Sequence, residues 1–199
     1  MKMFKKILRR MFLIAVVLIM YSFELPSGWF IAGSEAKSYE MGIDKGVGTD
    51  GKNAATIKSK KKKINGFGTL MQNCSPEKYI GKRVRMSGMV KTHNISGWAG
   101  LWLRIDERGS DKSIGFDNMR NGKKDRSICG TTDWTLYEIV LDVPPNASNL
   151  AYGALLSGPG QIWFDSLKFE IVDSDIPTTG KGNEKLMPLK DPENLDFEN

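Results

Sequence analysis

Aromatic and charged residues alternate with apolar ones in the segment GWAGLWLRID, residues 97–106. Because successive side chains of a strand point to opposite faces, the odd-numbered residues would form an unbroken apolar face: Ala99, Leu101, Leu103 and Ile105. The opposite face carries Trp98, Trp102, Arg104 and Asp106. Aromatic rings stack on the C–H faces of sugars and charged groups bind sugar hydroxyls, so this face is typical of a saccharide site. We therefore predict that Trp98, Trp102 and Arg104 contact a ligand.

Further polar residues within neighbouring predicted strands extend this candidate site. They are Gln72, Asp117 and Asn118, and each offers an amide or carboxylate to a ligand hydroxyl. A second interpretation stays open for the tryptophans, because a curved sheet can bury aromatic rings on both faces, and this face would then be a second core. We expect two later tryptophans, Trp134 and Trp163, to serve mainly in packing.

The sequence offers little for catalysis. His93 is the only histidine, whereas a charge-relay triad or a histidine-bound metal needs histidine with partners. No nucleophile-elbow, phosphate-loop or dinucleotide-binding motif is present. Carboxylate pairs that could hydrolyse glycosides can be drawn from four residues: Asp106, Asp117, Glu138 and Asp165. Acidic residues are common enough that such pairs indicate little, so we predict a protein that is not an enzyme.

Short apolar or alternating segments, separated by Gly, Asn, Asp and Pro, predict a chain built of strands. The segments are SYEMGI, AATIKS, GFGTLMQN, RVRMSGMVKT, AGLWLRID, SIGFDNM, WTLYEIVLDV, LAYGALLSG and QIWFDSLKFEIV. One helical turn is expected in SPEKYIG, residues 75–81, and no segment has sustained helical periodicity. Closely spaced strands predict an all-β fold, a β-sandwich of two antiparallel sheets over residues 37–175.

The N-terminus is typical of an exported protein. A basic start, MKMFKKILRR, precedes thirteen uncharged residues, MFLIAVVLIMYSF. This run is shorter than the ~20 residues of a membrane span and suits a signal peptide, with SEA at residues 34–36 as the cleavage site. An uncleaved anchor reaching through PSGWFIAG is the alternative. Residues 1–36 are thus predicted to be a signal peptide or membrane anchor. The rest of the chain is predicted to be secreted or held on the outer face of the cytoplasmic membrane.

The opposite end of the chain is polar and rich in Pro and Gly. Residues 176–199 contain little apolar surface to offset the entropy of ordering them. We predict a disordered or loosely docked tail.

Charge and cysteine content constrain the partners and the compartment. The net charge is +6, but outside residues 1–36 the chain has 24 basic and 21 acidic residues, which is an ordinary surface. No nucleic-acid partner is expected, and the run KSKKKK at residues 58–63 is interpreted as a solvated loop or hairpin tip. Cys74 and Cys129 are compatible either with one disulfide in an oxidising compartment or with two unpaired thiols.

The final third of the body, GTTDWTLYEIVLDVPPNASNLAYGALLSGPGQIWFDSLKFEIV, resembles the end of jelly-roll carbohydrate-binding modules of the galactose-binding-like superfamily. Those domains often end with a tryptophan strand, VP with a small-residue turn, and then G-x-(I/V)-W-(F/V)-D-x-(L/V/I). The segment YEMGID…GKNAATIKS resembles their opening strands. The resemblance covers roughly residues 39–172 and implies a jelly-roll β-sandwich. It also implies one structural calcium where the first and last strands meet, at the places matched by Glu40 and Asp165, whose oxygens suit this ion.

These observations lead to a functional expectation. The chain is expected to be an exported, non-catalytic module that binds a carbohydrate or a similar small ligand, with membrane contact only through its N-terminal segment if that segment is uncleaved. Similar domains also occur as sensing parts of bacterial regulators. The alternative is therefore a non-enzymatic extracytoplasmic sensor or protein-interaction domain of the same fold.

Overall fold

The computed structural model describes residues 23–110 and 112–182 of this chain. Within these ranges the chain is built of strands, with two single-turn 3-10 helices at Ala36–Ser38 and Glu77–Tyr79. The strands are β1 Phe30–Ala32, β2 Tyr39–Lys45, β3 Asn53–Ser59, β4 Phe67–Cys74, β5 Lys82–Glu107, β6 Ser113–Asp117, β7 Ile128–Val143, β8 Ala147–Ser157, β9 Gln161–Val172 and β10 Lys181–Gly182. No helix among the described residues has the length and apolar character that crossing a membrane requires.

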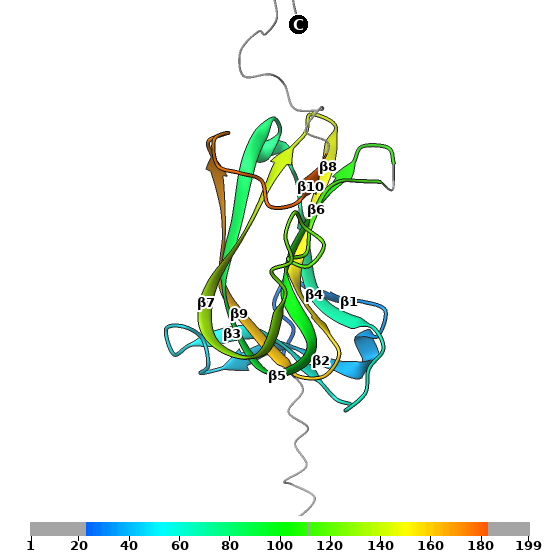
Figure 1. Ribbon diagram of the computed structural model, residues 1–199, viewed down its shortest axis with the longest axis vertical. Coiled ribbons are helices and arrows are strands. Elements are labelled where there is room, and N and C mark those ends of the chain that lie inside the picture. The colour runs from blue at the N-terminus through cyan, green and yellow to red at the C-terminus, as the bar shows by residue number, and fades with distance from the viewer. Residues whose placement is uncertain (1–22, 111, 183–199) are drawn as a thin grey trace, which may run out of the picture.

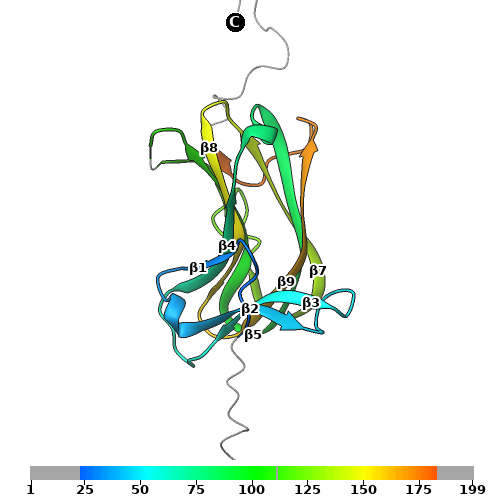
Figure 2. The same ribbon diagram turned by 180° about the vertical axis from the view of Figure 1, so that it is seen from behind.

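The strands form two layers that face each other (Figure 1). The first layer runs β2-β3-β9-β5-β7, and the second runs β1-β4-β8-β5-β6-β10, with every neighbouring pair antiparallel. The view from behind shows the same two layers on either side of the core (Figure 2). The predicted antiparallel β-sandwich is confirmed, with one refinement: the long strand β5 belongs to both layers, so the hydrogen-bonded sheet is continuous.

Strand β5 passes from the first layer to the second through a bend at Asn94 to Gly97. Up to His93 it pairs with β9, and from Trp98 it pairs with β8 and then, from Leu103, with β6. Its pairing with β7 continues irregularly through the bend to Ala99. Asn94 has φ of +52°, a left-handed conformation that interrupts the alternation of side chains. Gly97 has no room for a Cβ, which would collide with the carbonyl oxygen of Ser157.

The core lies between the layers and confirms the alternation predicted for residues 97–106. The even-numbered Val84, Met86 and Val90 point inward before the bend, and after it the odd-numbered residues of 99–105 do so. All of these side chains are fully buried. The inward parity therefore changes from even to odd across Asn94, because the left-handed residue shifts the alternation by one position.

The folded part begins earlier than the predicted boundary at residue 36. Strand β1 pairs with Thr69–Met71 of β4, and the amide of Ile43 donates to the carbonyl of Glu24 at 2.7 Å. Trp29 packs on Tyr152 and Phe164, with ring centroids 5.9 and 5.7 Å away. The predicted signal or anchor segment falls largely on residues 1–22, which lie outside the described residues.

The predicted tail is docked as far as Gly182. Thr179 and Val140 exchange two hydrogen bonds of 2.9 Å, Arg83 Nη1 donates to the carbonyl of Ile176 at 2.7 Å, and β10 pairs with β6. Of the two expectations for the tail, the structure has docking and not disorder for residues 176–182, because hydrogen bonds replace the missing apolar contacts. Residues 183–199 lie outside the described residues.

Cys74 and Cys129 are both free thiols. Cys74 ends β4 beside Leu150, whereas Cys129 lies in β7 and its Sγ donates to the carbonyl of Gly97 at 3.2 Å. The sequence was compatible with a disulfide or with two unpaired thiols, and the structure has two unpaired thiols.

Candidate functional site

The face that carries Trp98, Trp102 and Arg104 lies on the outer side of the second layer, as predicted, but much of it is buried. Trp102 is only 7 % exposed and packs with Met71, Ala151 and Leu155. Its indole nitrogen donates to Thr69 Oγ1 at 2.8 Å. The predicted contact between Trp102 and a ligand is therefore wrong, and the alternative of a second core is correct for this residue, because both its ring and its N–H have partners within the protein.

Trp98 and Arg104 lie at the edges of this second core. Trp98 is partly buried, and the guanidinium of Arg120 lies 5.2 Å from its ring centroid, so a cation already occupies a position over the aromatic face. Arg104 is exposed, and Asp106 accepts hydrogen bonds from its Nε at 2.7 Å and its Nη2 at 3.2 Å. Arg104 is more exposed than Trp98 and Trp102, and Trp98 is half-buried.

The three polar residues predicted to extend this site have structural roles. Asp117 is fully buried, pairs with Arg126 and accepts the backbone N–H of Met119 at 2.7 Å. Asn118 is 7 % exposed and accepts the N–H groups of residues 120 and 121. Gln72 points to the inner side, where it accepts from the hydroxyl of Tyr152 and donates to the carbonyl of residue 28. Asp117 and Asn118 are therefore not ligand contacts in this fold, because they organise the turn after β6.

A hollow of about 890 Å³ adjoins Arg104 on the second layer. Its lining includes Glu107, Lys112, Phe116 and Lys181, a mixture of charges with one aromatic ring. We name it the Arg104 hollow. It is the accessible part of the face that was predicted to bind a ligand.

The two residues matched to a calcium site lie apart. Glu40 of β2 is opposite Lys58 of β3, and Lys58 is opposite Gln161 of β9. Glu40 is thus level with Gln161, and Asp165 lies four residues farther along β9. At ~3.3 Å per residue this is a separation of about 13 Å along the strands, whereas two ligands of one calcium lie within about 5 Å of each other. The oxygens of Asp165 instead accept from Thr49 N at 2.9 Å and from Ser166 N at 2.6 Å. The prediction that Glu40 and Asp165 hold one ion together is thus wrong, and residues 23–110 and 112–182 contain no group of three or more His, Cys, Asp or Glu side chains that could hold a metal.

The outer face of the first layer carries a second, more open group of polar residues. Lys58 of β3 is opposite Gln161 of β9, and Gln161 is opposite His93 of β5. These three side chains therefore form a row across neighbouring strands, spaced by ~4.8 Å per strand. Lys58 and His93 are exposed, and Gln161 is half-buried. His93 is exposed and lies directly before the bend of β5 at Asn94.

A tryptophan lies in the next row on the same face. Trp163 is opposite Lys91 of β5, is half-buried, and donates from its indole nitrogen to Asp44 Oδ2 at 2.7 Å. It lies outside both buried clusters, so the expectation that it serves mainly in packing is wrong. We name Trp163, Lys91, Gln161, His93 and Lys58 the Trp163 face. The alternation in QIWFD and in MVKTH contained this signal, since it places all four residues of β9 and β5 on the side away from the core.

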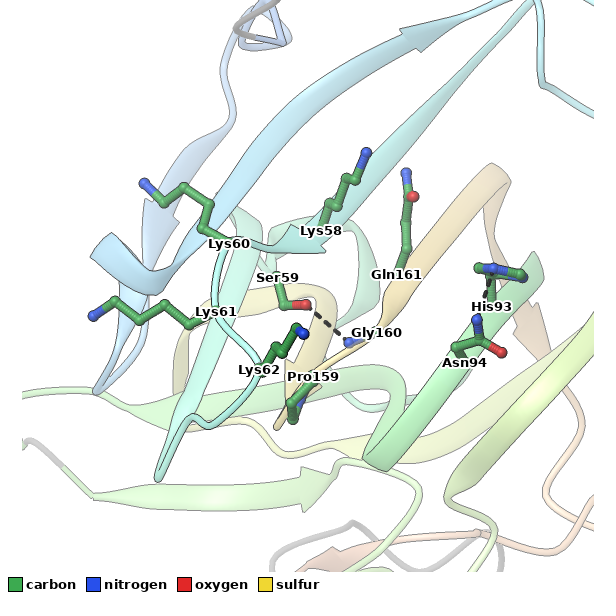
Figure 3. Close-up of a pocket in the computed structure, with 10 residues that line it drawn as sticks. All are labelled: Lys58, Ser59, Lys60, Lys61, Lys62, His93, Asn94, Pro159, Gly160 and Gln161. Atoms are coloured by element: carbon green, nitrogen blue, oxygen red, sulfur yellow. Dashed lines mark hydrogen bonds between the residues drawn. The ribbon is translucent and has the colours of Figure 1, made fainter.

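A pocket of about 340 Å³ lies at the end of the Trp163 face (Figure 3). Lys58, Gln161 and His93 contribute to it from the strands, and the loop that follows β3 adds Lys60, Lys61 and Lys62. The remaining lining residues are Ser59, Asn94, Pro159 and Gly160. The N–H of Gly160 donates to Ser59 Oγ at 3.0 Å, and His93 Nε2 lies 2.9 Å from Asn94 Nδ2. We name this the basic pocket.

The backbone conformation at Gly160, which lines the basic pocket, requires a glycine. Its φ is +135°, and a Cβ there would lie 2.9 Å from the carbonyl oxygen of Asn94. The start of β9 can therefore approach the bend of β5 closely only without a side chain.

Comparison with known proteins identifies one relative by sequence. The chain is 42% identical over 175 residues to the uncharacterized HTH-type transcriptional regulator YbfP of Bacillus subtilis (strain 168). The aligned region is 86% of this chain and 56% of that protein, so the chain spans little more than half of its relative. No protein-family model matches the chain.

Solved structures share the fold at low sequence identity. The CBM22-1 xylan-binding domain of Paenibacillus barcinonensis Xyn10C superposes with a TM-score of 0.52 at 16% identity, over 77% of this chain and 91% of that domain. The CBM22-1 and GH10 modules of a Clostridium thermocellum xylanase superpose with a TM-score of 0.52 at 12% identity, over 73% of this chain and 26% of that one. The chain thus has the jelly-roll fold of carbohydrate-binding modules, which confirms the resemblance seen in its sequence. At this identity the likeness concerns the fold, and function must be argued from the site.

Proposed function

We propose that this chain is a non-catalytic binding module that recognises a saccharide on the Trp163 face. The observation that carries the proposal is the row of Lys58, Gln161 and His93 beside the half-buried ring of Trp163. An aromatic ring for stacking, with an amide and charged donors on neighbouring strands, supplies what an open saccharide site needs. The jelly-roll neighbours include a domain named as xylan-binding, which agrees with the proposal.

The orientation of Trp163 supports its role as a platform. Its N–H is held by Asp44, so the ring is fixed before a ligand arrives, and a fixed ring loses little entropy on binding. Two of the acidic residues beside this face are engaged, Asp44 by the indole and Asp133 by Lys91 at 3.8 Å. We therefore assign them to positioning, in keeping with a module that does not act on its ligand.

A glycan array probed with the full-length chain tests the proposal. At least one glycan should bind, and Trp163→Ala should weaken that binding at least tenfold while the fold is retained. Arg104→Ala is the informative companion, because it removes the exposed group of the Arg104 hollow and should leave binding unchanged. Loss of binding in Arg104→Ala alone would move the site to the second layer, and an array without any bound glycan would refute the proposal.

A second candidate function is suggested by the sequence relative. Because a chain 42% identical over 175 residues is named as a transcriptional regulator, the same module could serve as an effector-sensing domain. Hydrogen exchange distinguishes the two: a sensor changes its exchange far from the ligand, whereas a simple binding module is protected only around the Trp163 face.

We also propose that the N-terminal segment exports the chain, either as a cleaved signal peptide or as an anchor. Its basic start and short apolar run support this. Protease treatment of intact cells should degrade the domain if it is exposed outside, and a full-length chain found soluble in the cytosol would refute export.

A further inference from the structure

The lining of the basic pocket concentrates positive charge. Its lining includes four lysines, and none of its ten described lining residues is acidic. Figure 3 shows Lys58 extending beside Gln161, with His93 on the far side of the pocket. Lys62 lies closer to Pro159 and Gly160, whereas Lys60 and Lys61 extend outward from the loop.

Several lysines elsewhere in the first layer and its loops have carboxylate partners, and the four pocket lysines do not among the residues that the structure describes. Lys45, Lys52 and Lys168 are each paired with a carboxylate at 3.7, 3.2 and 2.7 Å. Within the described part of the chain, no ion pair within 4 Å involves Lys58, Lys60, Lys61 or Lys62. Glu40 is opposite Lys58 in the strand register, yet the two form no such pair. Neighbouring lysines repel one another, and a bound anion would relieve this repulsion.

The other groups of the pocket suit an oxyanion. Asn94 carries an amide, Gln161 carries another, and the ammonium groups of lysine bind carboxylates and phosphates as point charges. The volume of about 340 Å³ is at the small end of ligand pockets, which suits one charged unit more than a long chain. The pocket adjoins the Trp163 face, so a saccharide lying on that face could place one substituent in it.

We infer that the basic pocket binds the negatively charged group of an acidic saccharide, either a uronate carboxylate or a phosphate ester. This inference rests on the proposed function, because the rest of that saccharide would lie on the Trp163 face. Lys58 and Lys62 contact the anion, and Lys60 and Lys61 raise the local positive potential.

Two matched pairs of probes test the inference by calorimetry with the full-length chain. The first pair is hexagalacturonate and its fully methyl-esterified form, and the second is a phosphorylated oligosaccharide before and after phosphatase treatment. In at least one pair the charged form should bind at least tenfold more tightly than the neutral form, and its affinity should fall as salt rises from 50 to about 500 mM. The pair that responds identifies the carboxylate or the phosphate as the recognised group.

Variants locate the effect. Lys58→Gln and Lys62→Gln should each weaken the charged probe at least threefold and leave the thermal midpoint unchanged, because both residues are exposed. Lys168→Gln is the matched control, since Lys168 is an exposed strand lysine of the same layer that Glu170 already pairs. Equal losses in all three variants would show general charge attraction and overturn the inference.

Other outcomes separate this inference from the proposed function. If charged and neutral probes bind alike, or if the glycan array yields neutral glycans alone, the anionic preference is wrong while the saccharide module stands. If neither probe pair nor any arrayed glycan binds, both are wrong.

Discussion

Replacing Trp102 by alanine is expected to destabilise the fold strongly. The side chain is 93 % buried against Met71, Ala151 and Leu155, and a buried tryptophan removes ~150–250 Å² from water. At ~25 cal/mol per Å² this is worth about 4–6 kcal/mol, as an upper estimate, and measured truncations of buried aromatic residues cost about 3–5 kcal/mol. The hydrogen bond to Thr69 adds ~0.5–1.5 kcal/mol.

Urea and thermal unfolding measure this loss. For a domain of this size, 3–5 kcal/mol should lower the thermal midpoint by about 6–20 °C. Trp102→Phe retains most of the volume and should lose clearly less, and Leu136→Ala, at a side chain that is 56% exposed, should stay within about 0.5 kcal/mol. If Trp102→Ala changes the free energy of unfolding as little as Leu136→Ala does, the second core does not exist in solution.

Three further outcomes follow from the same structure. A chain that begins after Ala36 should be about 1.5–3 kcal/mol less stable than one beginning at residue 23, because it lacks β1 and the packing of Trp29; equal urea midpoints would contradict this. Burial raises the pKa of Tyr39 to about 12 from 10.0, and the negative charge of Glu35 acts in the same direction. The stabilisation that the neutral Tyr39 hydroxyl provides should therefore be complete below pH 10 and lost as the pH rises toward 12. In melting curves recorded against pH, Tyr39→Phe should lose less stability over this range than the natural chain does. A thiol-reactive dye should label the exposed Cys129 before the half-buried Cys74, whose pKa is raised by burial; simultaneous labelling in the native state would argue against the burial of Cys74.

The sequence was informative about the fold because alternation is a local property. The parity of residues 97–106 predicted the inner face of β5 and the outer position of Trp102 correctly. The domain boundaries were less predictable: β1 has three residues, and residues 176–182 dock by backbone hydrogen bonds. Such contacts leave no apolar pattern in the sequence.

The site was harder to predict, because parity assigns a face but not its exposure. Whether Trp102 meets water depends on Met71 and Leu155, which come from other strands. The row of Lys58, Gln161 and His93 depends on the register of three strands far apart in sequence. Register is fixed by the assembled fold and cannot be deduced from any one segment.

The sharing of β5 between the layers has a consequence for the order of folding. Its main partners β7, β8 and β9 all follow it in the chain, so a chain growing at the ribosome exposes β5 before any of these strands exists. The first layer is completed only when Gln161–Val172 has emerged, and the second only when Lys181–Gly182 has. We expect folding to follow synthesis and to take milliseconds to seconds, as for other chains dominated by non-local pairing. During that interval the uncovered strand edges of β5 are open to pairing with another chain, which makes β5 the segment where intermolecular misassembly would begin.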